Sequence, residues 1–145
     1  MMGDLVVGVD GSDGARAALR FAVDEARLRD ARLRVVTAWH VPVLAYGGGI
    51  APPPLPDMGD DLESAARASV ENALAGVASD GVEIETVVRE GRPVEVLLEE
   101  AEGADLLIVG SRGLGGFGGL LLGSVSAQCA QHAHCPVVIV RGDGR

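Results

Sequence analysis

Residues 106–126 read LLIVGSRGLGGFGGLLLGSVS, and this stretch decides how the rest of the chain is interpreted. It opens on Leu106–Val109, four apolar residues that predict a strand buried on both faces and ending at Gly110. The loop that follows holds a third of the chain's 21 glycines, which expose backbone N–H groups and allow a close approach. Ser124 adds a hydroxyl at the predicted start of a helix, where the helix dipole favours an anion. The stretch therefore predicts a strand, an anion cradle and a helix in succession.

Outward from this strand, further apolar runs of strand length alternate with stretches of helical periodicity. The predicted strands are Leu5–Val9, Leu33–Trp39, Val82–Arg89, Leu106–Val109 and Pro136–Val140. The predicted helices start at a cap on Ser12 or Asp13, at Leu62 with Gly81 to end it, after Gly91-Arg92-Pro93, and at Ser124 to run to His134.

Strands separated by helices pair in parallel through right-handed crossovers. We therefore expect an α/β fold, an open, doubly wound five-stranded parallel sheet of order 3-2-1-4-5 with helices on both faces. One domain should span residues 1–145, because a chain of this length with 48% apolar residues can bury one core. The alternating pattern that begins at Val82 predicts an edge strand.

The segment from His40 to Gly59 is rich in Pro and Gly, and we expect no regular element in it. A connection of this length in a small domain is either functional or an excursion of the chain. Both interpretations, a cover over a ligand or a connection without function, stay open at the level of the sequence.

In the expected strand order the direction of winding reverses between strands one and four, and ligands bind outside the carboxyl ends of strands at such a point. The two strand ends are Val9-Asp10-Gly11 and Val109-Gly110-Ser111. Asp10 is then either a carboxylate beside a ligand or a cap for the following helix. The glycine-rich loop and Asp10 are thus predicted to meet at one site.

The charge of the chain excludes several classes of partner. With Asp+Glu 21 against Lys+Arg 12, the net charge is −9, which opposes binding to nucleic acid or an anionic membrane. All the basic residues are arginine, so a phosphate loop that depends on lysine is ruled out.

No apolar run reaches membrane-spanning length and no leader is evident, which predicts a cytoplasmic protein. In that compartment Cys129 and Cys135 should be reduced thiols rather than a redox pair. His40, His132 and His134 form no recognised metal spacing with them.

A dinucleotide fingerprint is present by spacing alone. Gly113, Gly115 and Gly118 satisfy G-x-G-x-x-G in a loop that follows a strand. The fingerprint requires those glycines to open the helix and an acid about twenty residues on. Leu120, Leu121 and Leu122 intervene before the helix, and residues 137–141 carry no acid. This motif is therefore not taken as a dinucleotide site.

Three segments together resemble the universal stress protein family. Gly110, Gly113, Gly123 and Ser124 match its ATP-binding signature, G-x2-G-x9-G-[ST]. The stretches VVGVDGS (6–12) and HCPVVIVR (134–141) are similar to the first and last strands of the family, in the right order and at the right distance. The resemblance spans essentially the whole chain.

The resemblance implies that ATP lies at this site. Val9, Asp10 and the end of the second strand, at Ala38 or Trp39, would lie near adenine and ribose. The ribose and phosphates would be wrapped by Gly110, Gly113, Gly123, Ser124, Val125 and Ser126, with Mg²⁺ between phosphate oxygens to offset charge in a site without lysine. Arg112 inside the signature either clamps a phosphate or is a solvated side chain. The family also implies a homodimer in which Val137–Val140 pairs with its copy.

The leading hypothesis is therefore an ATP-binding regulatory or signalling protein of the stress response, whose activity is binding and not turnover. No general base or activated nucleophile stands out, so any ATP hydrolysis or autophosphorylation, at Ser124 or Ser126, should be slow. Two alternatives remain: a nucleotidyl-transfer enzyme on the same topology, and a dimeric scaffold without a ligand.

Overall fold

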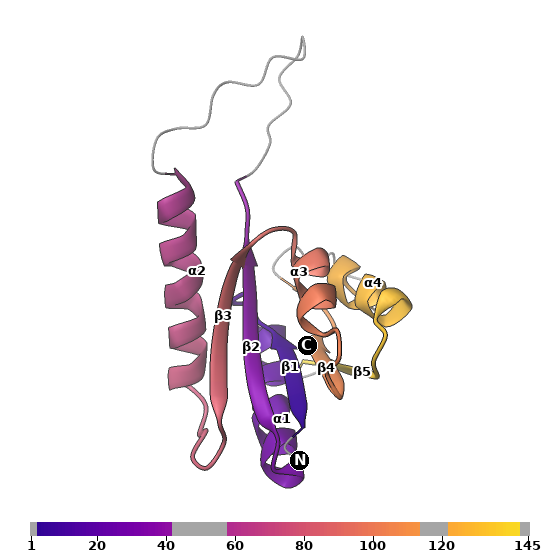
Figure 1. Cartoon of the computed structure of the whole chain (residues 1–145). Coiled ribbons are helices and arrows are strands. Elements are labelled where there is room, and N and C mark those ends of the chain that lie inside the picture. Colours follow the sequence, from indigo (N-terminus) through magenta and orange to yellow (C-terminus); the bar gives the residue numbers. More distant parts are fainter. Residues whose placement is uncertain (1–2, 42–57, 114–121, 143–145) are drawn as a thin grey trace.

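The computed structural model of the chain describes residues 3–41, 58–113 and 122–142. Within these ranges strands and helices alternate along the chain (Figure 1). The elements are β1 (Asp4–Gly8), α1 (Asp13–Arg29), β2 (Arg32–Trp39), α2 (Met58–Ala75), β3 (Ile84–Glu90), α3 (Pro93–Glu100), β4 (Leu106–Gly110), α4 (Ser124–His132) and β5 (Val137–Val140).

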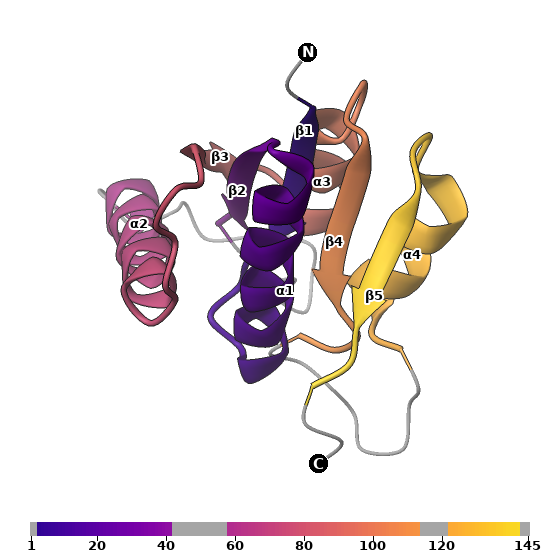
Figure 2. The same ribbon diagram turned by 90° about the horizontal axis from the view of Figure 1, so that it is seen from below.

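The strands form one parallel sheet of order β3-β2-β1-β4-β5, as the sequence predicts. β1 lies at its centre, where Leu5 pairs with Leu33 of β2 on one side and with Leu106 of β4 on the other. Figure 2 shows α1 and α2 on one face of the sheet and α3 and α4 on the other. β3 is an edge strand, again as predicted, and the winding reverses between β1 and β4.

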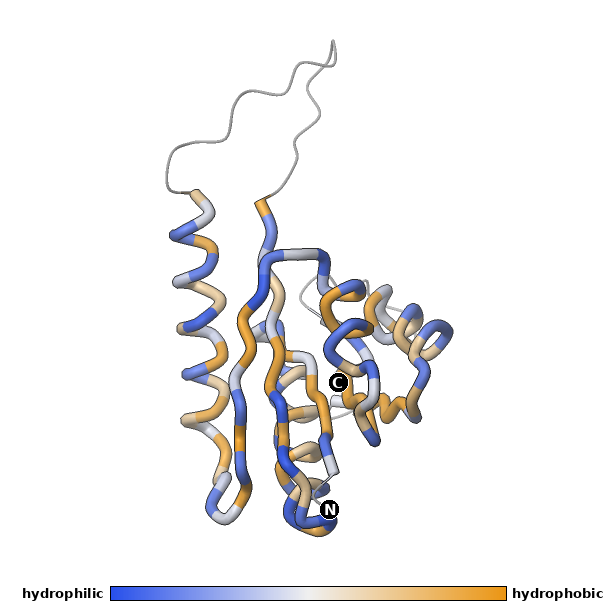
Figure 3. Tube along the Cα trace, viewed as in Figure 1, coloured by the Kyte–Doolittle hydropathy of each residue, from blue (hydrophilic) through white to orange (hydrophobic). Residues whose placement is uncertain are grey.

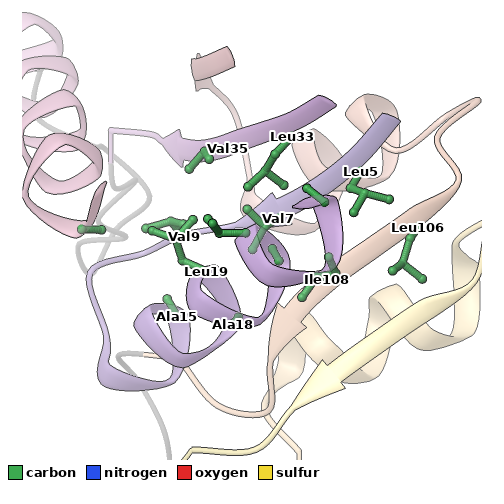
Figure 4. Packing of buried hydrophobic residues seen from close by; sticks show 14 of the residues in the cluster. Leu5, Val7, Val9, Ala15, Ala18, Leu19, Leu33, Val35, Leu106 and Ile108 are labelled. Atoms are coloured by element: carbon green, nitrogen blue, oxygen red, sulfur yellow. The ribbon is translucent and has the colours of Figure 1, made fainter. Parts of the chain in front are cut away.

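Each face of the sheet carries its own hydrophobic core. On the α1 side, the central strands pack against a helix stripe of small and medium side chains (Figure 4). That stripe consists of Ala15, Ala18, Leu19, Ala22, Val23 and Ala26. Its spacing is that of one face of an α-helix, and the alanines let the helix lie close to the strands. On the other face, Val96 and Leu97 of α3 and Cys129 of α4 pack against Val6, Val36 and Leu107. The continuous apolar runs of the central strands follow from burial on both faces.

Helix α2 buries fewer residues against the rest of the protein than α1 does. Only Val70 and Ala73 are buried in it, and blue and orange residues alternate along its length in Figure 3. It contacts β2 and β3 at the outer side of the sheet, and α1 to a smaller extent. The first turns of α2 therefore stand beside the carboxyl end of β2 and are not part of the main core.

Several predicted boundaries were wrong. Helix α2 spans Met58–Ala75 and so includes part of the segment predicted to lack regular structure, where Asp60 and Asp61 favour its first turn. It ends at Ala75, and Gly81, with φ of +80°, belongs to the turn before β3. Helix α4 ends at His132 because Ala133 adopts an extended conformation. The rest of the predicted irregular segment, residues 42–57, lies outside the described residues.

Candidate functional site

A cavity of about 610 Å³ opens where the carboxyl ends of β1, β2 and β4 meet α2 and the start of α4. Its size is typical of small-molecule sites. All ten residues predicted for the site border it, namely Val9, Asp10, Ala38, Gly110, Arg112, Gly113, Gly123, Ser124, Val125 and Ser126. The fold thus brings together groups from three separate parts of the sequence at the point where the winding reverses.

Asp10 is tied to the beginning of α1 through Ser12. Its Oδ1 accepts hydrogen bonds from the Ser12 N–H (2.9 Å) and from the Ser12 hydroxyl (2.5 Å). The Ser12 Oγ in turn accepts the Ala15 N–H (3.1 Å) and caps the helix. Of the two caps that the sequence allowed for α1, Ser12 is therefore the one in place. Asp10 supports the cap instead of being the cap itself, and its side chain borders the cavity in a fixed orientation.

Two glycines let the β4 end pack directly against α1. A Cβ placed on Gly110 would lie 2.8 Å from backbone atoms of Gly14, and one placed on Gly14 would lie 2.7 Å from the Arg112 carbonyl oxygen. Backbone atoms cannot yield as a side chain can, so these positions require glycine for packing. Gly110, which the family resemblance assigns to the ligand, also serves the contact between helix and loop because it has no side chain.

The two ends of the glycine-rich loop are joined at Ser111. Its carbonyl accepts the Gly123 N–H (2.6 Å) and the hydroxyl of Ser126 (2.8 Å), and its own N–H donates to the Val140 carbonyl (2.9 Å). Ser126 is only 1% exposed. Residues 114–121, with Gly115 and Gly118 of the dinucleotide-like spacing, lie outside the described residues.

The start of α4 differs from the start of α1. Its cap is Gly123, which supplies no side-chain hydrogen bond, and the first N–H to bond back along the helix is that of Ala127, to the Gly123 carbonyl. The N–H groups of Ser124, Val125 and Ser126 precede that bond and have no acceptor inside the helix. All three residues border the cavity, and Ser124 is exposed. This helix end offers N–H donors and a partial positive charge to the cavity.

The end of β2 extends beyond the end of β1. The last pair between them is Gly8 with Val36, with one more bond from the Val9 N–H to the Val36 carbonyl (2.9 Å). Alternate residues of a parallel strand direct their N–H and C=O to the same neighbour, so those of Ala38 point toward the β1 side, as those of Val36 do. They lie past the last β1–β2 pair, at the level where β1 turns away and the cavity begins.

A model of the universal stress protein family matches residues 1–141. The chain belongs to the universal stress protein family. The resemblance inferred from the glycine signature and the terminal strands is confirmed.

Some relatives of this universal stress protein are about twice its length, and others match it over their whole length. A universal stress protein of Mycolicibacterium smegmatis is 39% identical over 139 residues, which cover 94% of this chain and 45% of that protein. The chain thus spans about half the length of that relative. Among solved structures, a universal stress protein in complex with cAMP is 31% identical with a TM-score of 0.67, and covers 97% of both chains. The Archaeoglobus fulgidus protein in complex with dAMP is 26% identical with a TM-score of 0.57, covering 97% of this chain and 98% of that one.

The cavity of this universal stress protein also includes residues that the sequence did not predict. They are Thr37 and His40 at the end of β2, Ala65, Ala66 and Ser69 of α2, and Pro93 and Leu97 of α3, with Gly8, Ser12, Ala15, Val36, Val109 and Leu122 around the strand ends. Small side chains on α2 carry no chemical signal of their own. The only hint available was that α2 follows the strand that ends at the site.

Arg112 and His40 supply the basic groups of the lining. Both are exposed, and within residues 3–41, 58–113 and 122–142 neither has an acidic partner. Over those same ranges, no helix is long and apolar enough to cross a membrane. The cavity is bordered by backbone N–H donors, by the Asp10 carboxylate and by the Arg112 guanidinium, and most of its other lining side chains are apolar.

Proposed function

We propose that the chain binds an adenine nucleotide in this cavity, with Mg-ATP as the physiological ligand, and acts as a regulatory protein of the stress response. One observation carries the proposal: among the described residues, the part of β2 beyond its last pair with β1, a carboxylate and a helix start without a side-chain cap border a single cavity at the reversal of the sheet. A strand edge suits a base, and a helix start suits a phosphate.

At the base end, the N–H and C=O of Ala38 form a donor and an acceptor beside each other. The Watson–Crick edge of adenine offers the complementary pair, the N1 acceptor next to the 6-amino donor, whereas guanine carries the two functions in reverse order, with the O6 acceptor in place of the amino group and an N1–H donor in place of the acceptor. Val9 and Leu97 supply apolar surface nearby. The complexes of the two related structures with cAMP and dAMP support an adenine ligand.

At the phosphate end, the first N–H groups of α4, the Ser124 hydroxyl and Arg112 would replace the lysine that the chain lacks. The described lining contains a carboxylate, Asp10, and a hydroxyl, Ser124, both oxygen donors of the kind that Mg²⁺ takes. The donor set therefore fits Mg²⁺ held mainly by phosphate oxygens, which would neutralise part of the triphosphate charge.

Binding, and not turnover, is the proposed activity, so any hydrolysis or autophosphorylation is slow. Ser124 is the proposed phosphoacceptor because it is exposed, whereas the Ser126 hydroxyl is buried and donates to the Ser111 carbonyl. We also propose that two copies pair through β5 and that the protein is cytoplasmic. Within the described residues β5 is an outer strand of the sheet, and such a strand presents backbone N–H and C=O groups that can pair with a second copy.

Trp39 makes the proposal directly testable, because it is the single tryptophan of the chain and stands between Ala38 and His40, which both border the cavity. Its fluorescence should change saturably with ATP and with cAMP, and not with GTP at the same concentrations. A Trp39→Phe variant controls for signal from the nucleotide itself. Equal responses to ATP and GTP would contradict base recognition by Ala38, and rapid release of phosphate from ATP would favour the enzyme alternative.

A further inference from the structure

We infer that Ser126 is a positioning residue that closes the base of the glycine-rich loop through its side chain, and that its hydroxyl is not a ligand of the phosphates. The inference rests on the proposed nucleotide site, and concerns how the chain prepares that site before a ligand arrives. It replaces the sequence prediction that Ser126 wraps the phosphates with its hydroxyl.

The hydroxyl of Ser126 is already used inside the protein. It donates to the carbonyl of Ser111 at 2.8 Å, and the Gly123 carbonyl lies at 3.1 Å from the same oxygen. A hydroxyl has one proton, and phosphate oxygens only accept hydrogen bonds at neutral pH. Because Ser126 is 1% exposed, the hydroxyl cannot turn toward a ligand without breaking a buried bond.

The bond that it makes fixes the spacing of the two loop ends. The Ser111 carbonyl also accepts the Gly123 N–H at 2.6 Å, and the Ser111 N–H donates to Val140 of β5. Ser111 is thus held by β5 on one side and by α4 on the other. Arg112 and Gly113 follow it directly, and Ser124 follows Gly123 directly, so the same bonds set the distance between the two groups of cavity-lining residues.

The packing around Gly123 keeps this arrangement tight. A Cβ on Gly123 would lie 3.3 Å from the Arg112 Cα and 3.4 Å from the Ser111 carbonyl oxygen. The backbone of the segment around Arg112, at one end of the loop, therefore lies in contact with the backbone of Gly123 at the other end. A site whose donors are held in place before binding loses less entropy when the ligand binds, so the Ser126 bond should contribute to affinity without touching the ligand.

The test compares Ser126→Ala, Ser126→Thr and Ser124→Ala in the full chain, with two readouts. The first is amide hydrogen exchange of Gly123 in the protein without nucleotide, relative to the buried amide of Val7 as an internal reference for global unfolding. The second is the dissociation constant for Mg-ATP. Loss of one hydrogen bond of about 1 kcal/mol corresponds to roughly a fivefold change in an equilibrium.

Ser126→Ala should accelerate Gly123 exchange by about fivefold or more without ligand and weaken Mg-ATP binding by a similar factor. Ser126→Thr, which keeps the hydroxyl that donates to the Ser111 carbonyl, should restore both. Ser124→Ala should leave Gly123 exchange unchanged. Weaker binding with unchanged exchange would make the Ser126 hydroxyl a direct ligand and overturn the inference. Faster exchange with unchanged affinity would overturn it as well. If the wild type does not bind Mg-ATP, the proposed function fails, and the exchange data alone decide whether Ser126 fixes the loop base.

Discussion

Gly113 lies against the carboxylate of Asp10, so that a Cβ placed on Gly113 would come within 2.5 Å of the Asp10 Oδ2. The two residues follow different strands, β4 and β1, and meet across the point where the winding of the sheet reverses. The other carboxylate oxygen of Asp10 is bonded to Ser12. The Asp10 carboxylate therefore lies between Ser12, which it bonds, and the backbone of Gly113.

Replacing Gly113 by alanine should impair the site and spare the fold. The added methyl group meets the end of a side chain, which can move, so thermal stability should change little, while the displaced Asp10 carboxylate should weaken Mg-ATP binding by roughly tenfold. Gly142→Ala is the matched control, since a Cβ there meets nothing within 4 Å. Calorimetric titration of both variants checks this, and equal affinities would show that Asp10 need not hold its position.

Replacing Gly110 by alanine should instead destabilise the protein. The Cβ would meet the Gly14 backbone carbon and oxygen at 2.8 Å and the Ala15 nitrogen at 3.2 Å, so α1 and β4 must separate. Overpacking of this kind costs about 1–3 kcal/mol of unfolding free energy. Urea denaturation measures the loss. An unchanged midpoint and slope would mean that the contact between the loop and α1 is loose.

The Cys129 thiol gives a pH dependence with a defined sign. It is fully buried, and burial, with a smaller effect of Cys135, raises its pKa from 9.0 to about 11. Folding therefore favours the neutral thiol. Its stabilising contribution is complete below pH 9 and is lost as the pH rises from 9 to 11.

The free energy of unfolding of the wild type should consequently fall more steeply than that of Cys129→Ala as the pH rises from 9 to 11. Below pH 9 the variant should already be the less stable protein, because the smaller side chain leaves a cavity. Urea midpoints at several pH values from 8 to 11 make the comparison. If the urea midpoints of the two proteins fall in parallel as the pH rises, the Cys129 thiol titrates in the folded protein as it does in the unfolded chain.

The free edge of β5 allows a sharp test of the proposed dimer. The carbonyls of Pro136 and Val140 accept the N–H groups of Leu107 and Ser111, each at 2.9 Å, so these residues face β4. By alternation Val138 also faces β4, whereas Val137 and Ile139 direct their N–H and C=O to the free edge.

Ile139→Pro should therefore give a folded monomer, because the N–H that it removes faces outward, although loss of the Ile139 side chain from the core on the α3–α4 face should lower its stability. Val138→Pro removes an inward one and should disturb the fold. Light scattering after size-exclusion chromatography reports the mass, and circular dichroism reports the fold. A monomeric wild type, or an Ile139→Pro variant that stays dimeric, would argue against pairing through β5.

The sequence was sufficient for the sheet order, which follows from the alternation of strands and helices. Of the ten predicted residues, those at the strand ends could be placed from the same alternation, whereas residues 123–126 were placed by the family resemblance. Asp10 and Gly110 stand directly after apolar runs, and in a parallel sheet those ends must lie on one edge. Helix boundaries were less predictable, since α2 already includes Met58 and Gly59, which belong to the segment where Pro and Gly predicted no regular element. Asp60 and Asp61 favour the first turn of a helix, but acidic residues are as common in loops.

The detailed roles at the site needed the structure. The sequence showed that Gly110 and Ser126 belong to a signature, and could not show that one serves packing against Gly14 and the other donates to Ser111. Ala66 and Ser69 were missed because a small residue on a helix face has many uses. Hydrogen bonds and close contacts between separate segments decide these roles.

Calorimetric titration of the purified chain with Mg-ATP tests the central claim most directly, with Asp10→Ala measured beside it. We expect saturable binding of one nucleotide per chain, weakened by roughly tenfold when the Asp10 carboxylate is lost. The absence of heat, together with no nucleotide released on denaturing the purified protein, would contradict it and would favour a scaffold that carries no ligand.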